Sequence, residues 1–487
     1  MVLLHGGTIR TLDPAKPTAA ALVVGGRTIA AVLDDADDAP AGVPRFDLEG
    51  GCALPGFTDA HVHFPTWALS LRELSLLGTG SLEEAVQRVA RATPAGGWIR
   101  GGGWRDETWG EGRPSAAALD AVRSDVPIAL RAHDFHSLWL NSAALALADG
   151  DLETPGGVVE RDERGEPTGV LREEAAWRFE GRFPPTYDDM LAAMRIAMPE
   201  AGAAGVVAVH DKDGGRGAPA LFAALRAAGE LPLRVWQSFP ADADDLTGAD
   251  YVKAFMDGTL GSRTARLLDG TGVEITSSEE LAELIRRAAA HDLPLAVHAI
   301  GDRANRDALD AFAATRADWA PKGLRPRIEH AQCVHPDDQP RFAALGVTAS
   351  VQFTHATSDR DVADRLWGER ADHAYPYRSL RDGGAVLAGG SDAPIEALDP
   401  LAGLRAAVLR TDSDRPPWRP EQALALDDAL AAFTTAPAWL ERAEASRGRL
   451  APGLAADVVV LDRDPYEDLA GARVAATMLD GDWIHLP

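Results

Sequence analysis

Between residues 57 and 391, short apolar runs alternate with alanine-rich helical stretches such as 278–291. This alternation is typical of βα units that build a parallel sheet. Eight runs have the character of strands: 57–63, 204–210, 233–238, 251–257, 293–299, 326–331, 347–353 and 385–391. Eight such strands predict an α/β fold of the (β/α)8 TIM-like barrel type, in which functional residues gather at the C-terminal ends of the strands.

A long segment separates the first two predicted strands. About 140 residues lie between positions 63 and 204, far more than one βα crossover needs. We therefore predict a large insertion after strand 1, at about 65–200, which leaves the barrel at its functional rim. This insertion is rich in glycine and tryptophan, and we expect it to form a substrate-cap subdomain.

The two ends of the chain show a different pattern. Near the N-terminus, 21–24 and 28–32 are short β-type runs separated by a glycine pair, and 457–462 and 476–479 resemble them near the C-terminus. We expect both ends to pair into one small β-sandwich domain. The predicted organisation is a composite β domain from 1–56 plus 437–487 and a barrel over 57–436 that contains the insertion.

The composition narrows the class of protein only in part. The 487 residues carry a formal net charge of −26, which argues against nucleic acid and anionic membranes as partners. The two cysteines, Cys52 and Cys333, are too few for a disulfide framework and favour a reducing compartment. No run of about 18 apolar residues and no export signal is evident. We expect a cytoplasmic enzyme.

Side chains that bind metals follow several predicted strands. His61 and His63 lie two residues apart, and alternate residues of a strand face the same side, so both imidazoles can hold one ion. Four more strand ends carry a residue able to hold a metal: Lys253, His298, His330 and Asp392. The sequence therefore predicts a metal site built from the ends of several strands.

Lys253 is notable because lysine is rare in this chain. Only four of the 48 basic residues are lysines, so arginine occupies nearly every position where any positive charge would serve. A guanidinium stays protonated in proteins, whereas a desolvated lysine can become a neutral amine. Such an amine can take up carbon dioxide to form a carbamate, whose two oxygens would bridge two metal ions. The alternative is a strand-end lysine with no special role.

Six motifs, taken in order, carry a resemblance to a known family. They are 54–63 (LPGFTDAHVH), 136–145 (HSLWLNSAAL), 252–265 (VKAFMDGTLGSRTA), 298–302 (HAIGD), 328–332 (IEHAQ) and 390–394 (GSDAP). The set resembles the amidohydrolase superfamily and, within it, the branch of N-substituted formamide deformylases, often called YtcJ-like proteins. The resemblance covers nearly the whole chain. His-x-His alone is weak evidence, but the ordered set is specific.

The resemblance implies a binuclear metal centre. In the superfamily pattern, His61, His63 and Asp392 bind one divalent ion, His298 and His330 bind the second, and carboxylated Lys253 bridges them. Zinc is the first choice, although manganese, iron, cobalt and nickel accept similar ligands. The implied reaction is hydrolysis of a carbon–nitrogen bond in a small non-peptide amide by a metal-activated hydroxide, with Asp392 as general base and then general acid.

Three further residues lie at or just after the ends of predicted strands, near the predicted centre. His355 comes just after the 347–353 run and is a candidate catalytic donor to the developing oxyanion. Gln352 is a weaker candidate for contact with the substrate. His210 ends the 204–210 run, where it either lines the pocket or forms a hydrogen bond behind a ligand.

The insertion and the loop after Lys253 supply candidates for substrate binding. Trp104 and Trp109 offer broad apolar walls with a hydrogen-bond donor, or they pack the insertion's own core. His136 and Trp139 reach over the site or are structural. Arg263 is a candidate partner for a substrate carboxylate, with an internal ion pair as the alternative.

Two other functions stay open at the level of sequence. One is a cyclic amidohydrolase or deaminase of the same superfamily with a single ion, which the carboxylation-competent lysine disfavours. The other is a non-catalytic barrel scaffold, against which the complete ligand set argues. The substrate depends on loop conformations that fold analogy does not determine. A homodimer is the assembly common among the proteins that the chain resembles.

Overall fold

The computed structural model describes residues 1–110 and 112–486, and an eight-stranded parallel sheet lies at its centre. Consecutive strands along the chain are neighbours in this sheet, and its first and last strands also contact each other, so it forms a nearly closed barrel. The strands are β8 (Phe57–Val62), β15 (Val206–Asp211), β16 (Arg234–Pro240), β17 (Tyr251–Phe255), β18 (Leu295–Ala299), β19 (Arg327–His330), β20 (Thr348–Val351) and β21 (Leu387–Gly389). The predicted α/β barrel is confirmed.

Helices cover the outside of the barrel, and the main hydrophobic core lies between them and the strands. They include α7 (Ala218–Ala228), α8 (Ser278–Ala290), α9 (Asp302–Ala314), α11 (Gln339–Leu345), α14 (Tyr377–Asp382), α15 (Pro400–Leu409) and α16 (Leu426–Phe433). Helix α8 begins with a capping box, in which the side chains of Ser277 and Glu280 each accept a backbone N–H of the other. Within the described residues, no helix is both long and apolar enough to cross a membrane.

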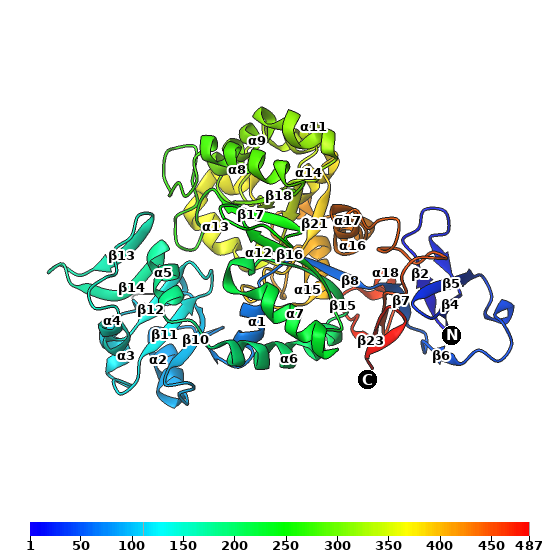
Figure 1. Cartoon of the computed structure of the whole chain (residues 1–487), viewed down its shortest axis with the longest axis horizontal. Helices are drawn as coiled ribbons and strands as arrows, with labels where there is room; N and C mark the ends of the chain where they lie inside the picture. The colour runs from blue at the N-terminus through cyan, green and yellow to red at the C-terminus, as the bar shows by residue number, and fades with distance from the viewer. Residues whose placement is uncertain (111, 487) are drawn as a thin grey trace.

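The segment between β8 and β15 forms a second, six-stranded sheet, which Figure 1 shows at the left beside the barrel. Its strands are β9 (Leu74–Ser75), β10 (Ile99–Trp104), β11 (Ile128–Ala132), β12 (Ser137–Leu140), β13 (Gly157–Arg161) and β14 (Pro167–Glu173). Its helices are α2 (Leu82–Arg91), α3 (Ala116–Asp120), α4 (Ser142–Leu147) and α5 (Glu174–Arg182). Helices α1 (Phe64–Ser70) and α6 (Tyr187–Ala203) contact each other where the chain leaves and re-enters the barrel.

The two ends of the chain share a sheet on the opposite side of the barrel (Figure 1). Strand β7 (Cys52–Pro55) pairs antiparallel with β22 (Val458–Leu461) in a sheet that also holds β2 (Thr8–Arg10), β3 (Thr18–Ala19), β23 (Val474–Leu479) and β24 (Asp482–His485). Another four-stranded sheet contains β1 (Val2–His5), β4 (Ala21–Gly25), β5 (Thr28–Leu33) and β6 (Arg45–Asp47). The exact domain limits and the sandwich arrangement stay predictions.

A close approach between β8 and the end of β21 shapes the functional rim. A Cβ atom at Gly390 would lie 2.4 Å from the backbone nitrogen of His61, so only glycine fits without a shift of the backbone. Two residues later, the backbone N–H of Asp392 donates to the carbonyl oxygen of His61 at 2.7 Å. The first and last barrel strands therefore bring His61 and Asp392 together.

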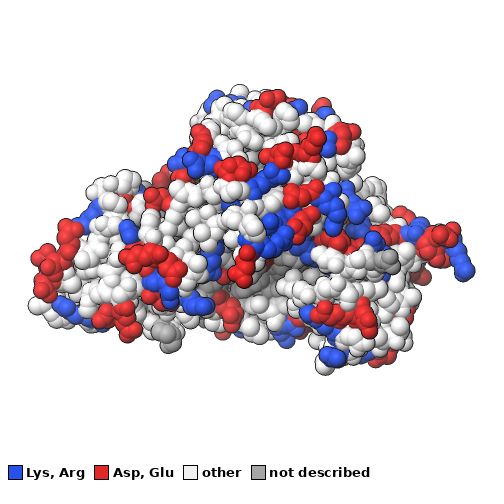
Figure 2. All heavy atoms as spheres, turned by 180° about the vertical axis from the view of Figure 1, so that it is seen from behind, with Lys and Arg blue, Asp and Glu red and all other residues white. Residues whose placement is uncertain are grey.

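Charged residues of both signs are mixed on the surface. Figure 2 shows a face on which Lys and Arg side chains gather across the middle of the molecule, with Asp and Glu among them. The excess of acidic residues therefore does not make this face uniformly negative.

Candidate metal centre and its pocket

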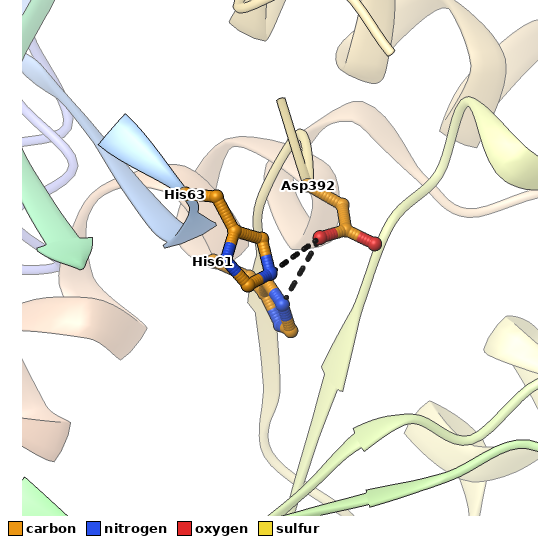
Figure 3. A group of neighbouring side chains, drawn as sticks. All are labelled: His61, His63 and Asp392. Atoms are coloured by element: carbon orange, nitrogen blue, oxygen red, sulfur yellow. Dashed lines mark ion pairs between the residues drawn. The ribbon is translucent and has the colours of Figure 1, made fainter. Parts of the chain in front are cut away.

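The first group of predicted ligands converges at the C-terminal end of the barrel. The Nε2 atoms of His61 and His63 lie 3.1 Å and 3.6 Å from Oδ1 of Asp392, and Figure 3 shows both rings turned toward this carboxylate. One ligand atom from each of the three residues lies within 4.8 Å of the others. This spacing suits three ligands of one ion.

A second group adjoins the first and shares Asp392. His330 and His355 each place a ring nitrogen within 4.8 Å of the other and of this carboxylate. His298 lies beside His330, with ring centroids 4.5 Å apart, and its Nε2 donates to the carbonyl oxygen of Gly258 at 3.1 Å. All six predicted metal-centre residues line one cavity: His61, His63, Lys253, His298, His330 and Asp392.

Three of the histidines are oriented from behind by a second hydrogen bond. In each case the ring nitrogen Nδ1 is engaged by a buried polar side chain, which fixes the ring and leaves Nε2 for another partner. The pairs are His61 with Glu329 at 2.7 Å, His63 with Asp213 at 2.7 Å and His330 with Gln352 at 2.8 Å.

Glu329 connects His61 to the buried ammonium group of Lys212. Its Oε1 accepts a hydrogen bond from Nζ of Lys212 at 2.8 Å, and both side chains have no exposed surface. Burial by itself would raise the pKa of Glu329, but Arg327, Lys212 and His61 hold it well below its usual range. Sequence reasoning missed Glu329 and Lys212, although the rarity of lysine is a signal that applies to Lys212 as well.

Lys253 has an environment suited to a reactive amine. Burial lowers its pKa to about 8, although the carboxylates of Glu329 and Asp392 act in the opposite direction. Roughly a tenth of such amines are neutral at pH 7, against fewer than about one in a thousand for an ordinary lysine. Because only the neutral amine reacts with carbon dioxide, this environment favours a carbamate.

Two of the predicted ligands have a strained backbone. His330 and Asp392 have φ angles of 74° and 60°, in the left-handed region that side chains other than glycine rarely adopt. Such strain costs on the order of 1–3 kcal/mol per residue and persists where the surrounding structure enforces it, commonly at functional sites. The conformations of both residues are therefore consistent with a functional centre.

The centre opens into a cavity of about 670 Å³ whose outer wall comes from the insertion. Two polar contacts join the insertion to barrel loops at this wall. Thr259 Oγ donates to Asp134 Oδ2 at 2.7 Å, and Arg105 Nη2 donates to Asp359 Oδ1 at 3.0 Å. The insertion and the barrel therefore enclose the cavity together.

The tryptophans of the insertion correct one sequence expectation. Trp104, Trp109 and Trp139 pack against one another, with ring centroids 5.9–6.2 Å apart, and each indole N–H donates to a backbone carbonyl oxygen. Trp109 and Trp139 lie outside the cavity lining, and Trp104 borders the cavity with only 1% of its surface exposed. Trp109 and Trp139 therefore fill the insertion's own core, whereas Trp104 packs with them and also lines the cavity.

Three further predictions of substrate contact are corrected. Arg263 is exposed and lies outside the cavity lining. His210 is fully buried between Glu441 and Arg327, which lie 2.7 Å and 2.8 Å from its two ring nitrogens. Gln352 is occupied with His330, as described above. By contrast, His136 does line the cavity, with its Nδ1 2.6 Å from Glu173.

Sequence reasoning also missed the aromatic wall of the cavity. Trp177 on α5 lines the cavity with Phe255, their ring centroids 6.0 Å apart, and lies 5.0 Å from the ring of His136. Phe255 in turn lies 5.4 Å from the ring of His298. An apolar group of a substrate would therefore pack on Trp177 and Phe255 close to the metal ligands.

Trp177→Ala should raise KM for amides with a bulky apolar group by roughly tenfold, because an aromatic contact of this kind contributes on the order of 1 kcal/mol or more. Amides with a small group should change little. The measurement is steady-state kinetics on a paired bulky and small amide.

Trp139→Ala is the matched control, since this ring is buried outside the cavity. It should lower the free energy of unfolding by about 3–5 kcal/mol and leave the ratio of the two KM values unchanged. Equal effects of Trp177→Ala on both amides would assign that ring to packing.

Another group of metal-binding side chains lies outside this cavity. Asp302, Cys333 and His373 place one ligand atom each within 4.8 Å of the others. A positive charge is already present there, because Nε of Arg370 lies 3.5 Å from Oδ2 of Asp302. The other carboxylate oxygen of Asp302 accepts the backbone N–H of Leu268. The groups at the barrel mouth are therefore the stronger candidates for a metal centre.

The fold and the site together define a barrel with candidate metal-binding residues at its strand ends. The sequence matches the model of the amidohydrolase family over residues 45–485, so the chain belongs to this family. The resemblance inferred from the motifs is confirmed, and the chain is a hydrolase that acts on carbon–nitrogen bonds.

Relatives support this assignment along nearly the whole chain. The putative amidohydrolase YtcJ of Bacillus subtilis (strain 168) is 31% identical, over 87% of this chain and 86% of that protein. The N-substituted formamide deformylase of Arthrobacter pascens is 28% identical, over 99% and 97%. The crystal structure of an uncharacterized metal-dependent hydrolase from Pyrococcus furiosus superimposes with a TM-score of 0.75 at 30% identity, covering 95% of this chain and 99% of that one.

Proposed function

We propose that the protein hydrolyses the carbon–nitrogen bond of a small non-peptide amide, such as an N-substituted formamide, at a centre of two divalent ions. The observation that carries this proposal is the convergence of His61 and His63 on Asp392 inside a cavity of about 670 Å³. The relative named as an N-substituted formamide deformylase supports the substrate class.

The donor set fits the proposed metal pair. His61, His63 and Asp392 would hold one ion, His298 and His330 would hold the other, and carboxylated Lys253 would bridge them. The hydrogen bonds at Nδ1 of His61 and His63 leave Nε2 of both rings directed at the shared carboxylate. Imidazole and carboxylate ligands suit zinc among the common divalent metals. When bound, such ions lower the pKa of a water molecule and polarise a substrate carbonyl.

Asp392 is placed to move the protons of the reaction. Its Oδ1 faces His61 and His63, and its Oδ2 lies 3.8 Å from a ring nitrogen of His330 and 4.0 Å from one of His355. Asp392 would accept a proton from the attacking water and deliver it to the leaving nitrogen. Amide cleavage needs this second transfer because an unprotonated amine anion is a poor leaving group.

His355 would stabilise the negative charge that develops on the carbonyl oxygen. Its Nδ1 accepts a hydrogen bond from Nε2 of Gln332 at 3.1 Å, which puts the ring proton on Nε2. Among the described residues, this buried Nε2 has no hydrogen-bond partner, and it points toward Asp392. A donor preorganised in a buried site stabilises an oxyanion without reorganisation during the reaction.

The insertion would act as a substrate cap over residues of about 65–200, within a barrel domain of about 57–436. Its contribution of His136 and Trp177 to the cavity lining supports this role. The composite β-sandwich domain from 1–56 plus 437–487, a homodimeric assembly and a cytoplasmic location stay predictions.

Elemental analysis of protein purified without chelators and with bicarbonate should find about two divalent ions per chain. Removal of the metal should abolish hydrolysis of N-substituted formamides, because the water then keeps its ordinary pKa. Activity should return when zinc and bicarbonate are supplied together.

The same experiment separates the alternatives. One ion per chain with full activity would favour a mononuclear cyclic amidohydrolase or deaminase. No bound ion, even after metal is supplied, would favour the scaffold and overturn the proposal.

A further inference from the structure

The outer part of the cavity is rich in carboxylates. Apart from the six predicted metal-centre residues and from Lys212 and Asp213 behind them, the described side chains of its lining include seven carboxylates and two guanidinium groups. They are Asp106, Glu107, Asp134, Glu174, Asp242, Asp359 and Glu396, with Arg105 and Arg172. The chain as a whole has 74 acidic and 48 basic residues, so the imbalance in the cavity is larger than the composition alone predicts.

Both guanidinium groups are already paired. Arg105 donates to Glu107 at 2.9 Å and to Asp359 at 3.0 Å. Arg172 donates to Glu160, which lies outside the lining, at 2.7 Å. Among the side chains that the structure describes, the remaining five carboxylates have no lysine or arginine ion pair. These five are Asp106, Asp134, Glu174, Asp242 and Glu396.

Of these five carboxylates, Glu396 is the nearest in sequence to the metal centre, four residues after Asp392. Its side chain is only 18% exposed, and its sole ion pair among the described residues is with Nε2 of His133, at 3.6 Å. The His133 contact is made by Oε1 of Glu396. Burial would raise the pKa of Glu396, but His133, His355 and Ser358 lower it to about 2, so this carboxylate is ionised. A cationic group on a bound molecule would be attracted to this largely buried negative charge.

Glu174 and Trp177 lie side by side on another part of the cavity wall, where Glu174 supplies a negative charge. They are three residues apart on α5 and therefore lie on one face of the helix. Glu174 of the insertion and Asp242 of a barrel loop both line the cavity. Burial, Glu173 and then Asp242 raise the pKa of Glu174, so the two lining carboxylates repel each other. A cation between them would remove this repulsion and could also contact the Trp177 ring.

We propose that this pocket selects amides that carry an ammonium or another cationic group away from the scissile bond, and that it discriminates against amides that carry a carboxylate. The inference rests on the proposed amide hydrolysis and names its substrate class. The placement of Arg263 outside the cavity agrees with it, because this removes the predicted partner for a substrate carboxylate. Positive ions at the metal centre would attract a distal carboxylate and repel a distal ammonium, so a preference for the ammonium compound would have to come from the carboxylates of the cavity wall.

The test is a matched series of N-benzylformamides with an aminomethyl, a methyl or a carboxylate group at the para position. At low ionic strength, kcat/KM should be at least about tenfold higher for the ammonium compound than for the carboxylate compound, a difference of about 1.4 kcal/mol. The methyl compound should lie between them. Added salt should reduce the ratio, since partly exposed charges are screened.

Glu396→Gln combined with Glu174→Gln should reduce the ratio by a factor of three or more, and it should lower kcat/KM for the ammonium compound more than for the methyl compound. Glu279→Gln, at an exposed position on α8, is the matched control and should change neither quantity. Equal kcat/KM values along the series, or an unchanged ratio in the double variant, would overturn the inference while leaving amide hydrolysis in place.

If no member of the series is hydrolysed, the proposed function is at fault, and binding tests the inference separately. Calorimetry on the metal-loaded protein would compare the corresponding methanesulfonamides, which are not hydrolysed. Tightest binding of the ammonium compound would support the inference, and equal or reversed affinities would overturn it.

Discussion

Lys253→Ala is expected to lower kcat/KM for an N-substituted formamide by roughly a thousandfold or more, about 4 kcal/mol of transition-state stabilisation. The reason is that only Lys253 would supply the bridge between the two metal positions, whereas each of the other predicted ligands would bind a single ion. Metal content should fall from about two ions to one or fewer. The measurements are steady-state kinetics and elemental analysis on the same preparations.

Two further variants of Lys253 make this test specific. Lys253→Arg keeps the positive charge but cannot become a neutral amine, so it should be as inactive as the alanine variant. Lys253→Glu supplies a carboxylate and should recover part of the metal content. Far-UV circular dichroism should stay unchanged in all three variants. Undiminished activity in Lys253→Arg would exclude a bridging carbamate.

The environment of Lys253 also predicts how its carboxylation depends on pH. Because burial lowers its pKa to about 8, the neutral amine of the metal-free protein increases as the pH rises through 8. A carbon-13 NMR signal from labelled bicarbonate should therefore appear in metal-free protein and strengthen between pH 7 and 9. The same signal should be missing from Lys253→Arg.

Asp392→Asn is expected to lower kcat for amides by roughly a hundred- to ten-thousandfold, the usual contribution of general acid–base catalysis. The amide side chain cannot accept the proton of the attacking water or return it to the leaving nitrogen. It is nearly isosteric, so the hydrogen bond from the backbone N–H of residue 392 to the carbonyl oxygen of His61 should persist.

Comparison with an activated ester separates proton transfer from metal binding. A phenolate leaves without protonation, so Asp392→Asn should affect a phenyl ester much less than an amide of similar size. Equal losses on both substrates, together with lost metal, would show that Asp392 acts only as a ligand. Metal content measured on the same samples completes the comparison.

The barrel strands, and the rim on which the candidate metal-binding residues lie, could be predicted because both depend on local sequence patterns. Each barrel strand is a short buried run bounded by loops, and parallel strands place their C-terminal ends on one rim. His61, His330 and Asp392 each lie at or just after such an end, so their convergence follows from topology. The spacing of His61 and His63 is likewise a property of a single strand.

The carboxylates that hydrogen-bond to His61 and His63 could not be predicted in the same way. Glu329 meets His61 across 268 positions of the chain, and Asp213 meets His63 across 150. Neither carboxylate differs in sequence from the many others, since the chain has 74 acidic residues. Only the packing of neighbouring barrel strands selects these two.

The sequence by itself determined the α/β barrel and its amidohydrolase motifs, and it placed the candidate metal-binding residues at the strand ends, because periodicity and strand ends are local properties. The tertiary structure decided that Trp139 packs the insertion's core, that Trp177 lines the cavity, and that Arg263 lies outside it. It also decided that the cavity is acidic. The physical reason is that burial and electrostatic environment arise from contacts between distant segments, which residue type and spacing leave open.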